Sequence, residues 1–369
     1  MNAENSTEFF QPPILMNVEE ASLLSERYEI PEQDIILIAL NLSGINAEIP
    51  QKRVRFKLTP GTTSRDFYFA LCVNSAETPF NLIGSEMYLS SVKIGEVSGL
   101  ENDTCNDNYF RRNGTELTLN TNARSSCRGC NFCGTYSLEA EDKERLLDKI
   151  ILEHRVSKIL SEKGEADCSN LYRVSICTGC FGSEEKAVKH LINVNDVLNK
   201  LNFKGDLRYI GSEIVSEQAI DSIANHIEKF ALSFTAEVFA RRGEILRPNK
   251  ARISIDDIKR VLCNIGNRGF EANILYVLGL DPLQVLIDGF EELFPYMNHF
   301  PIVNLFQIYS PEQALLKDTE ANRIEYYLKA RKALENIYKN STLRPESWEN
   351  YRPLWYLSFA KEDKNDIRI

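Results

Sequence analysis

Three cysteines lie close together in the run Cys127-Arg-Gly-Cys130-Asn-Phe-Cys133. A thiol at every third position brings soft ligands together, and thiolates bind iron–sulfur clusters, zinc or copper(I). A closed structural zinc site takes four ligands, usually as two separated pairs. Three cysteines in one loop leave one coordination position of the metal site open for another group. The spacing therefore predicts an open metal site.

The same run resembles the cluster loop of the radical S-adenosylmethionine (radical SAM) enzymes. The usual family pattern is Cys-x3-Cys-x2-Cys with an aromatic residue just before the last cysteine. Phe132 holds the aromatic position, and Cys130-Asn-Phe-Cys133 matches the second half of the motif. The first gap departs from the pattern, because two residues separate Cys127 from Cys130 instead of three. A structural zinc knuckle and a chance group of thiols are the alternatives that the run alone leaves open.

The composition indicates a reduced, globular protein. Hydrophobic residues make up 43% and charged residues 26% of the 369 residues, and no apolar run is long enough for a membrane helix. The net charge of −10 argues against nonspecific nucleic-acid binding. Nine cysteines, several of them in Cys-x2-Cys groups, are typical of metal binding rather than of a secreted disulfide framework. The polar, acidic N-terminus is no signal peptide, so we expect a cytoplasmic location.

Residues 1–110 are expected to form an accessory region rich in β-strands. A short helix is expected over 18–27, followed by apolar runs that are broken by turn residues. Runs that we expect to contribute strands lie at 35–42, 53–58, 67–72 and 87–97. The polar stretch 101–108 marks the boundary of this region.

Strands and helices alternate after this boundary. Six strands are expected at 116–120, 171–176, 207–210, 230–236, 272–278 and 301–309, each followed by a helix. Such alternation predicts an α/β fold with a parallel sheet and helices packed outside it. The resemblance implies that residues 111–343 form a partial, TIM-like (β/α)6 barrel, with the cysteine loop after its first strand. The aromatic-rich segment 344–369 is expected to close the barrel, with a substrate lid as the alternative.

The resemblance also implies cofactor contacts at other strand ends. Gly179 is similar to a glycine of the turn that holds the amino end of S-adenosylmethionine, although Cys180 stands where a second glycine is usual. Glu237 and Arg241 resemble the residues that hold the methionyl amine and carboxylate, and guanidinium groups suit carboxylates. Gly279 resembles the glycine of the strand along the adenine. The alternatives are an ordinary ion pair for Glu237 and Arg241 and a plain strand-to-helix turn for Gly279. His299, Asn304 and Gln307 are weaker candidates for substrate contacts.

The implied chemistry is reductive cleavage of S-adenosylmethionine. Cys127, Cys130 and Cys133 would bind a [4Fe–4S] cluster, and the 5′-deoxyadenosyl radical would act on a small metabolite, a natural-product intermediate or a small peptide. A reductase or a flavodoxin- or ferredoxin-type protein would supply the electron. No nucleic acid or membrane partner is expected, and the catalytic residues stay unknown. A metal-stabilised, non-catalytic binding protein is the main alternative, and a simple electron carrier is another.

The remaining cysteines of the core raise the question of a second metal site. Cys177 and Cys180 form a Cys-x2-Cys pair, and Cys168 lies shortly before them. Three thiols are one short of an all-cysteine site. We therefore expect a single cluster, with these three residues unligated.

Overall fold

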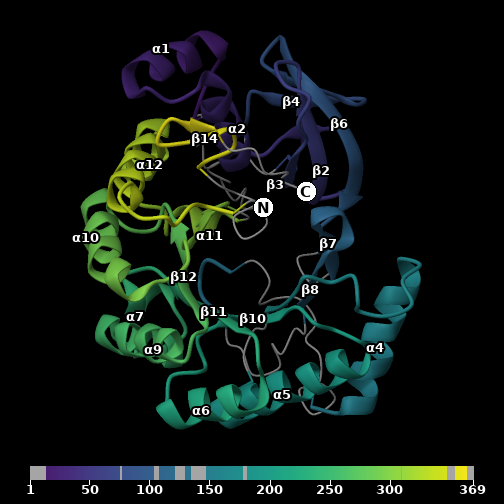
Figure 1. The fold of residues 1–369 in the computed structure, drawn as a ribbon. Helices are drawn as coiled ribbons and strands as arrows, with labels where there is room; N and C mark the ends of the chain where they lie inside the picture. The colour runs from purple at the N-terminus through teal and green to yellow at the C-terminus, as the bar shows by residue number, and fades with distance from the viewer. Residues whose placement is uncertain are drawn as a thin grey trace, which may run out of the picture.

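The computed structural model describes residues 14–74, 77–103, 108–120, 129–133, 147–177, 181–308, 310–346 and 354–363. Two large sheets dominate it (Figure 1). One belongs to the N-terminal third of the chain, and the other forms the core with helices along its outer side.

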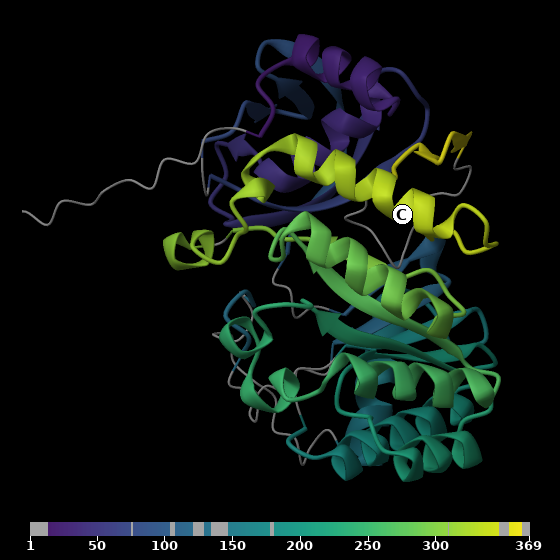
Figure 2. The same cartoon turned by 90° about the vertical axis from the view of Figure 1, so that its left-hand side faces the viewer.

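The core sheet confirms the predicted series of parallel strands. It has seven strands in the order β13-β12-β11-β10-β9-β8-β7. Every neighbouring pair from β8 to β13 is parallel, and only β7 pairs antiparallel, at the edge. The strands are β7 (Tyr109–Arg111), β8 (Glu116–Asn120), β9 (Arg173–Cys177), β10 (Asp206–Gly211), β11 (Phe230–Glu237), β12 (Glu271–Leu278) and β13 (Ile302–Leu305). Six parallel strands in chain order, curled into an open sheet, form a partial TIM-like barrel (Figures 1 and 2).

The strand register separates an apolar from a polar face. Leu117, Val174 and Leu207 lie in one row across β8, β9 and β10, and all three belong to the hydrophobic core. The next row is polar and includes Ser175 and Arg208. Because side chains alternate along a strand, one row faces the surrounding helices and the other faces the inside of the curled sheet.

Helices cover the outside of this sheet in the expected alternation. The long ones are α4 (Lys149–Glu162), α5 (Glu184–Lys200), α6 (Glu217–His226), α9 (Ile255–Asn267), α10 (Leu283–Leu293) and α12 (Ile324–Tyr338). Short ones are α7 (Arg242–Ile245), α8 (Pro248–Ala251), α11 (Pro311–Ala314), η1 (Arg112–Gly114), η3 (Phe294–Tyr296) and η4 (Glu320–Asn322). Ser183, Ser216 and Ser254 begin α5, α6 and α9, and each side chain accepts a backbone N–H of the first turn. Within the residues described, no helix is long and apolar enough to cross a membrane.

The N-terminal region contains a helix pair and a six-stranded sheet in the order β1-β4-β5-β6-β2-β3. Its elements are α1 (Val18–Tyr28), α2 (Glu32–Ser43), β1 (Asn46–Ala47), β2 (Arg53–Pro60), β3 (Phe67–Cys72), β4 (Phe80–Ile83), β5 (Glu86–Leu89) and β6 (Val92–Asn102). The expectation of a strand at 35–42 is wrong, because this run lies inside α2. The residues from Asp34 to Asn41 are all buried, so the helix shows no amphipathic period that would distinguish it from a buried strand.

A buried ionic network joins the N-terminal helices to the last barrel helix and to the C-terminal segment. Asp34 of α2 accepts Arg331 of α12 at 2.8 Å, and both side chains are almost fully buried. The same carboxylate accepts the backbone N–H groups of Tyr356 and Leu357. Trp355 is also buried and packs edge-on against Phe300. The described residues 354–363 include β14 (Ser358–Phe359) and β15 (Glu362–Asp363), and those from Leu354 to Tyr356 are packed into the core.

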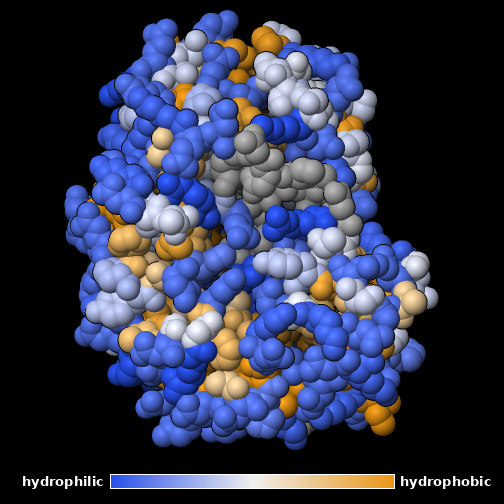
Figure 3. Space-filling model, viewed as in Figure 1, coloured by the Kyte–Doolittle hydropathy of each residue, from blue (hydrophilic) through white to orange (hydrophobic). Residues whose placement is uncertain are grey.

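The coloured surface in the view of Figure 1 is mainly hydrophilic, with apolar residues among the hydrophilic ones (Figure 3). This agrees with a chain in which charged residues make up 26% of the sequence.

The amino ends of the barrel strands carry buried charges that give a pH-dependence of stability. Burial raises the pKa of Glu116 to about 7, although Arg112 and Arg173 oppose the shift. Between about pH 4.5 and 7 the folded chain therefore holds more protons than the unfolded chain, and stability falls as the pH rises through this window. Glu116→Gln should remove this fall and stabilise the protein at pH 8 by up to about 3 kcal/mol. Urea denaturation at pH 5 and pH 8 measures the free energy of unfolding of both proteins.

The exposed Glu162, changed to Gln, is the matched control and should give the same pH-dependence as the unchanged protein. A Glu116→Gln variant that still loses stability between pH 5 and pH 7 as the unchanged protein does would refute the assignment.

Candidate functional site

The described part of the cysteine loop, residues 129–133, lies at the carboxyl ends of β11, β12 and β13. Cys130 is buried in an apolar cluster with Val238, Val277 and Phe306, which stand at or just after these strand ends. Chemistry in barrels gathers at this edge of the sheet. Cys130 and Cys133 therefore lie at the edge of the sheet where barrel enzymes have their active sites.

Hydrogen bonds from two short helices fix the loop. The backbone N–H of Asn131 donates to the carbonyl of Ile245 at 2.8 Å, and its side-chain amide donates to the carbonyl of Glu244 at 2.7 Å. The amide of Gln313 in α11 donates to the carbonyl of Phe132 at 3.1 Å. Phe132 therefore contributes its backbone to this anchoring, besides packing against the apolar cluster.

Two of the three predicted metal ligands can be placed. The N–H of Cys133 donates to the carbonyl of Cys130 at 2.9 Å, which is a tight turn with a thiol at each end. Cys127 lies outside the described residues. Among the residues that are described, no group of three or more His, Cys, Asp or Glu side chains is close enough to hold a metal ion. Two soft thiols on one turn fit an iron–sulfur cluster or zinc in their donor chemistry.

The thiol of Cys130 needs a cation to ionise. Burial, and next the charge of Glu237, raise the pKa of this thiol to about 12. A metal ion at the same position reverses that balance, because a coordinated thiol is deprotonated outright. Cys130 is thus an inert thiol by itself and a good ligand beside a metal.

Glu237 stands beside Cys130 in a strained backbone conformation. A bulge interrupts the β11–β12 pairing between Thr235 and Glu237, and Glu237 has a φ of 65°. Its Oε2 atom lies 3.9 Å from the Sγ of Cys130 and 2.5 Å from the Nζ of Lys250. Strain of this kind clusters at functional sites. The bulge turns a carboxylate toward the cysteine loop.

Lys250 is a residue that sequence reasoning missed. It lies in α8 and is only 6% exposed, and its partner Glu237 is 9% exposed. Arg242 supports the same turn by donating to the carbonyls of Val238 at 2.7 Å and Lys250 at 3.0 Å. No motif marks Lys250, because only the folding of the segment after β11 brings it back to Glu237.

Arg241 is already engaged in this structure. Its guanidinium pairs with Glu244 and donates to the carbonyl of Leu316 at 2.9 Å. It has a φ of 34°, which is unusual for a residue other than glycine. The expected role of Arg241 as a carboxylate ligand stays a prediction, and Lys250 is a second cation close to Glu237.

Gly279 directly follows β12 at a point where a side chain would be strained. Its φ is 111°, and a Cβ atom there would lie 3.0 Å from the hydroxyl of Tyr327. The N–H of Asp318 donates to its carbonyl at 2.9 Å. Asp281 then accepts the backbone N–H of Phe239 at 2.7 Å and so braces the segment after β11. The glycine is explained by packing, and its predicted contact with adenine is untested.

The cysteines around β9 lie at opposite ends of that strand. Cys177 is the last residue of β9, whereas Cys168 precedes the strand and is fully buried. A strand rises about 3.3 Å per residue, so the five residues of β9 separate the two ends by about 13 Å. Cys168 therefore cannot share one cluster with Cys177. Gly179 and Cys180 lie outside the described residues.

Two of the weaker candidates are engaged with other parts of the chain. His299 precedes β13 and lies near Glu271, which is the first residue of β12, so it stands at the amino edge of the sheet. Gln307 is 4% exposed and accepts Arg53 of β2 at 2.7 Å, and its amide donates to the carbonyl of Asn41. Gln307 thus joins the N-terminal sheet to the end of β13. Asn304 lies within β13 and is partly buried.

Comparisons with known proteins found no matching family model and no matching curated protein. Solved structures do match. SuiB of Streptococcus suis, bound to S-adenosylmethionine, has 13% sequence identity and a TM-score of 0.40, over 62% of this chain and 49% of SuiB. TsrM of Kitasatospora setae, a radical S-adenosylmethionine methyltransferase with cobalamin and a [4Fe-4S] cluster bound, has 10% identity and a TM-score of 0.34, over 50% of this chain and 36% of TsrM.

The arginine decarboxylase of Paramecium bursaria Chlorella virus, bound to agmatine, has 12% identity and a TM-score of 0.27, over 53% of each chain. The chain thus spans about half the length of SuiB and about a third of TsrM. The structures similar to this chain include a radical S-adenosylmethionine protein, and the similarity concerns part of each chain at low identity.

Proposed function

We propose that this chain is a radical SAM enzyme with a [4Fe–4S] cluster on Cys127, Cys130 and Cys133. One observation carries the proposal: the Cys-x2-Cys turn of 130–133 lies at the carboxyl edge of six consecutive parallel strands, beside a buried carboxylate. Neither a zinc knuckle nor an electron carrier needs a barrel edge. A small metabolite, a natural-product intermediate or a small peptide is the proposed substrate, with a flavodoxin- or ferredoxin-type electron donor.

The residues around Cys130 would perform two tasks. Val277 and Phe306 keep water from the thiol side, because both are buried against it. Glu237 and Lys250 offer an anion and a cation side by side, which is complementary to an amino acid's ammonium and carboxylate groups. A [4Fe–4S] cluster bound there would supply one electron for the cleavage of S-adenosylmethionine.

Anaerobic reconstitution tests the proposal. We expect iron and sulfide to bind, and the electron paramagnetic resonance spectrum of the reduced protein to change when S-adenosylmethionine is added. If the protein retains zinc, takes up no iron and shows no response to S-adenosylmethionine, it is instead the metal-stabilised binding protein.

The Glu237–Lys250 pair gives a separate prediction on cofactor affinity. Lys250→Met should weaken the binding of S-adenosylmethionine by about ten- to a hundredfold, since a hydrogen bond to a charged group contributes about 1.5–3 kcal/mol. Equilibrium dialysis of the reconstituted protein measures this affinity. Arg241→Ala is the matched comparison: if it lowers the affinity and Lys250→Met does not, the carboxylate is held by Arg241.

Loss of Lys250 also leaves a buried carboxylate unpaired, so folding needs its own control. The double variant Lys250→Met with Glu237→Gln removes both charges and should recover most of the stability. Its affinity should remain low if the pair binds the cofactor, and it should return to normal if the pair only supports the fold. Lys158→Met, at an exposed position of α4, should change neither property.

A further inference from the structure

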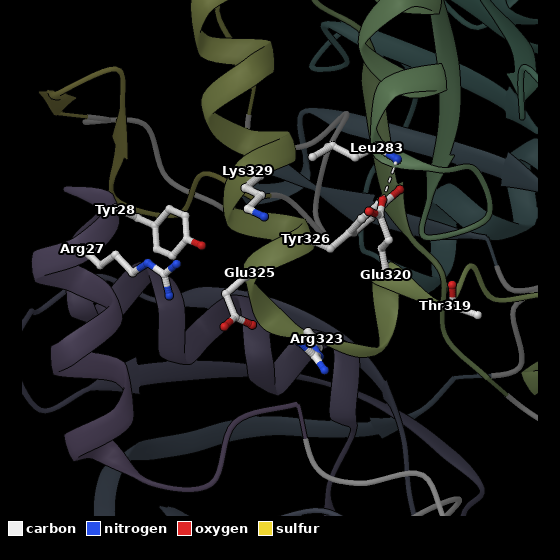
Figure 4. Close-up of a pocket in the computed structure, with 9 residues that line it drawn as sticks. All are labelled: Arg27, Tyr28, Leu283, Thr319, Glu320, Arg323, Glu325, Tyr326 and Lys329. Carbon is white, nitrogen blue, oxygen red and sulfur yellow. Dashed lines mark hydrogen bonds between the residues drawn. The ribbon is translucent and has the colours of Figure 1, made fainter.

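A groove lies outside the barrel where the N-terminal helix pair meets the last barrel helix (Figure 4). Its volume is about 500 Å³, which is within the range of small-molecule sites. The groove is lined by the end of α1, the start of α10, η4 and the first half of α12. None of these lining residues belongs to the cysteine site.

Three cations line this groove. Arg27 comes from α1, Arg323 directly precedes α12, and Lys329 lies in α12 (Figure 4). None of the three forms an ion pair or a side-chain hydrogen bond with any residue that the structure describes. The guanidinium of Arg27 lies over the ring of Tyr28, 5.3 Å from its centre. The groove therefore holds three positive charges without a bonded counter-ion.

The acidic residues of the groove balance only part of this charge. Glu320 is engaged elsewhere, because its carboxylate accepts the N–H of Leu283 at the start of α10, as the dashed line in Figure 4 shows. Glu325 is the other acid in the lining. Three cations against the two acids Glu320 and Glu325 leave an excess of 3 − 2 = 1 positive charge. This is a local exception on a chain with a net charge of −10.

We propose that this groove binds a small dianion, such as a phosphate monoester or a dicarboxylate, between Arg27, Arg323 and Lys329. Guanidinium groups bind such oxyanions through paired N–H donors, and the lysine ammonium adds a point charge. The hydroxyl of Tyr28 is buried and has no hydrogen-bond partner among the described residues, so the wall holds one more unused donor. The site is independent of the cysteine loop and goes beyond the proposed function.

Calorimetric titration of the full chain tests this site, with inorganic phosphate as the phosphate probe and succinate as the dicarboxylate probe, at constant ionic strength. We expect saturable binding of one probe to one site per chain. Arg323→Gln and Lys329→Gln should each weaken it by about tenfold or more, because each removes a charge-assisted contact. Glu325→Gln should strengthen it, because it removes one of the two opposing charges.

Arg260→Gln is the matched control, since Arg260 is an exposed arginine of α9 outside the groove. It should leave the affinity unchanged. All of the substituted groove residues lie at least partly on the surface, so the variants should fold, which circular dichroism verifies. Absence of saturable binding for both probes would overturn the proposal. An equal loss of affinity in Arg260→Gln would also overturn it, because the effect would then come from the overall charge of the protein and not from the groove.

Discussion

Replacing Cys127, Cys130 and Cys133 together with alanine should abolish the iron content of the reconstituted protein. The unchanged chain should bind about four irons, since cluster ligation by cysteine requires these thiolates. The triple variant should bind almost none and lose the brown colour. Iron and sulfide analysis after anaerobic desalting measures both proteins.

The same experiment separates one cluster from two. Cys263→Ala, at an exposed position of α9, is the matched control and should keep all the iron. Iron that stays in the triple variant and is lost only when Cys177 and Cys180 are also replaced would show a second cluster. That result would contradict the single-cluster prediction. Cys168 should have no effect in either case, because it lies at the other end of β9.

Asp34→Ala should destabilise the protein by about 3–5 kcal/mol, because it removes one of the two buried carboxylates that pair with Arg331 and leaves only Glu335. The change also removes the acceptor of the Tyr356 and Leu357 N–H groups, so the C-terminal segment should detach as well. The free energy of unfolding in urea measures the loss.

The control for Asp34 is an ion pair on the surface. Glu29 and Lys361 pair at 2.7 Å, and both side chains are mostly exposed. Glu29→Ala should cost less than about 1 kcal/mol, since exposed pairs contribute little. A loss of similar size in the two variants would show that the Asp34 network does not hold the N-terminal helices to the barrel.

The core of the fold could be predicted because its signals are local. Each of the six strands is a short apolar run, and serine N-caps mark the starts of helices such as α5 and α9. The prediction of a strand at 35–42 was wrong because an apolar run alone does not distinguish a buried strand from a buried helix. Buried on all sides, α2 lacks the period that separates a helix from a buried strand.

The candidate site was only partly accessible to sequence reasoning. Cys130 and Cys133 stand out by their spacing, and their place at the strand ends follows from the order of elements. Lys250 could not be predicted as a site residue, because its ion pair with Glu237 depends on the path of the chain through α7 and α8. The bond of Gln307 to Arg53 could not be predicted either, because the N-terminal sheet is distant from Gln307 in sequence.

The central claim is most directly tested by the products formed from S-adenosylmethionine. The reconstituted protein, reduced with dithionite under anaerobic conditions, should convert S-adenosylmethionine to 5′-deoxyadenosine and methionine in equal amounts, which chromatography with mass detection quantifies. The Cys127, Cys130 and Cys133 triple alanine variant should form neither product above the background. If the unchanged protein carries about four irons per chain and still forms no 5′-deoxyadenosine, the chain is not a radical SAM enzyme.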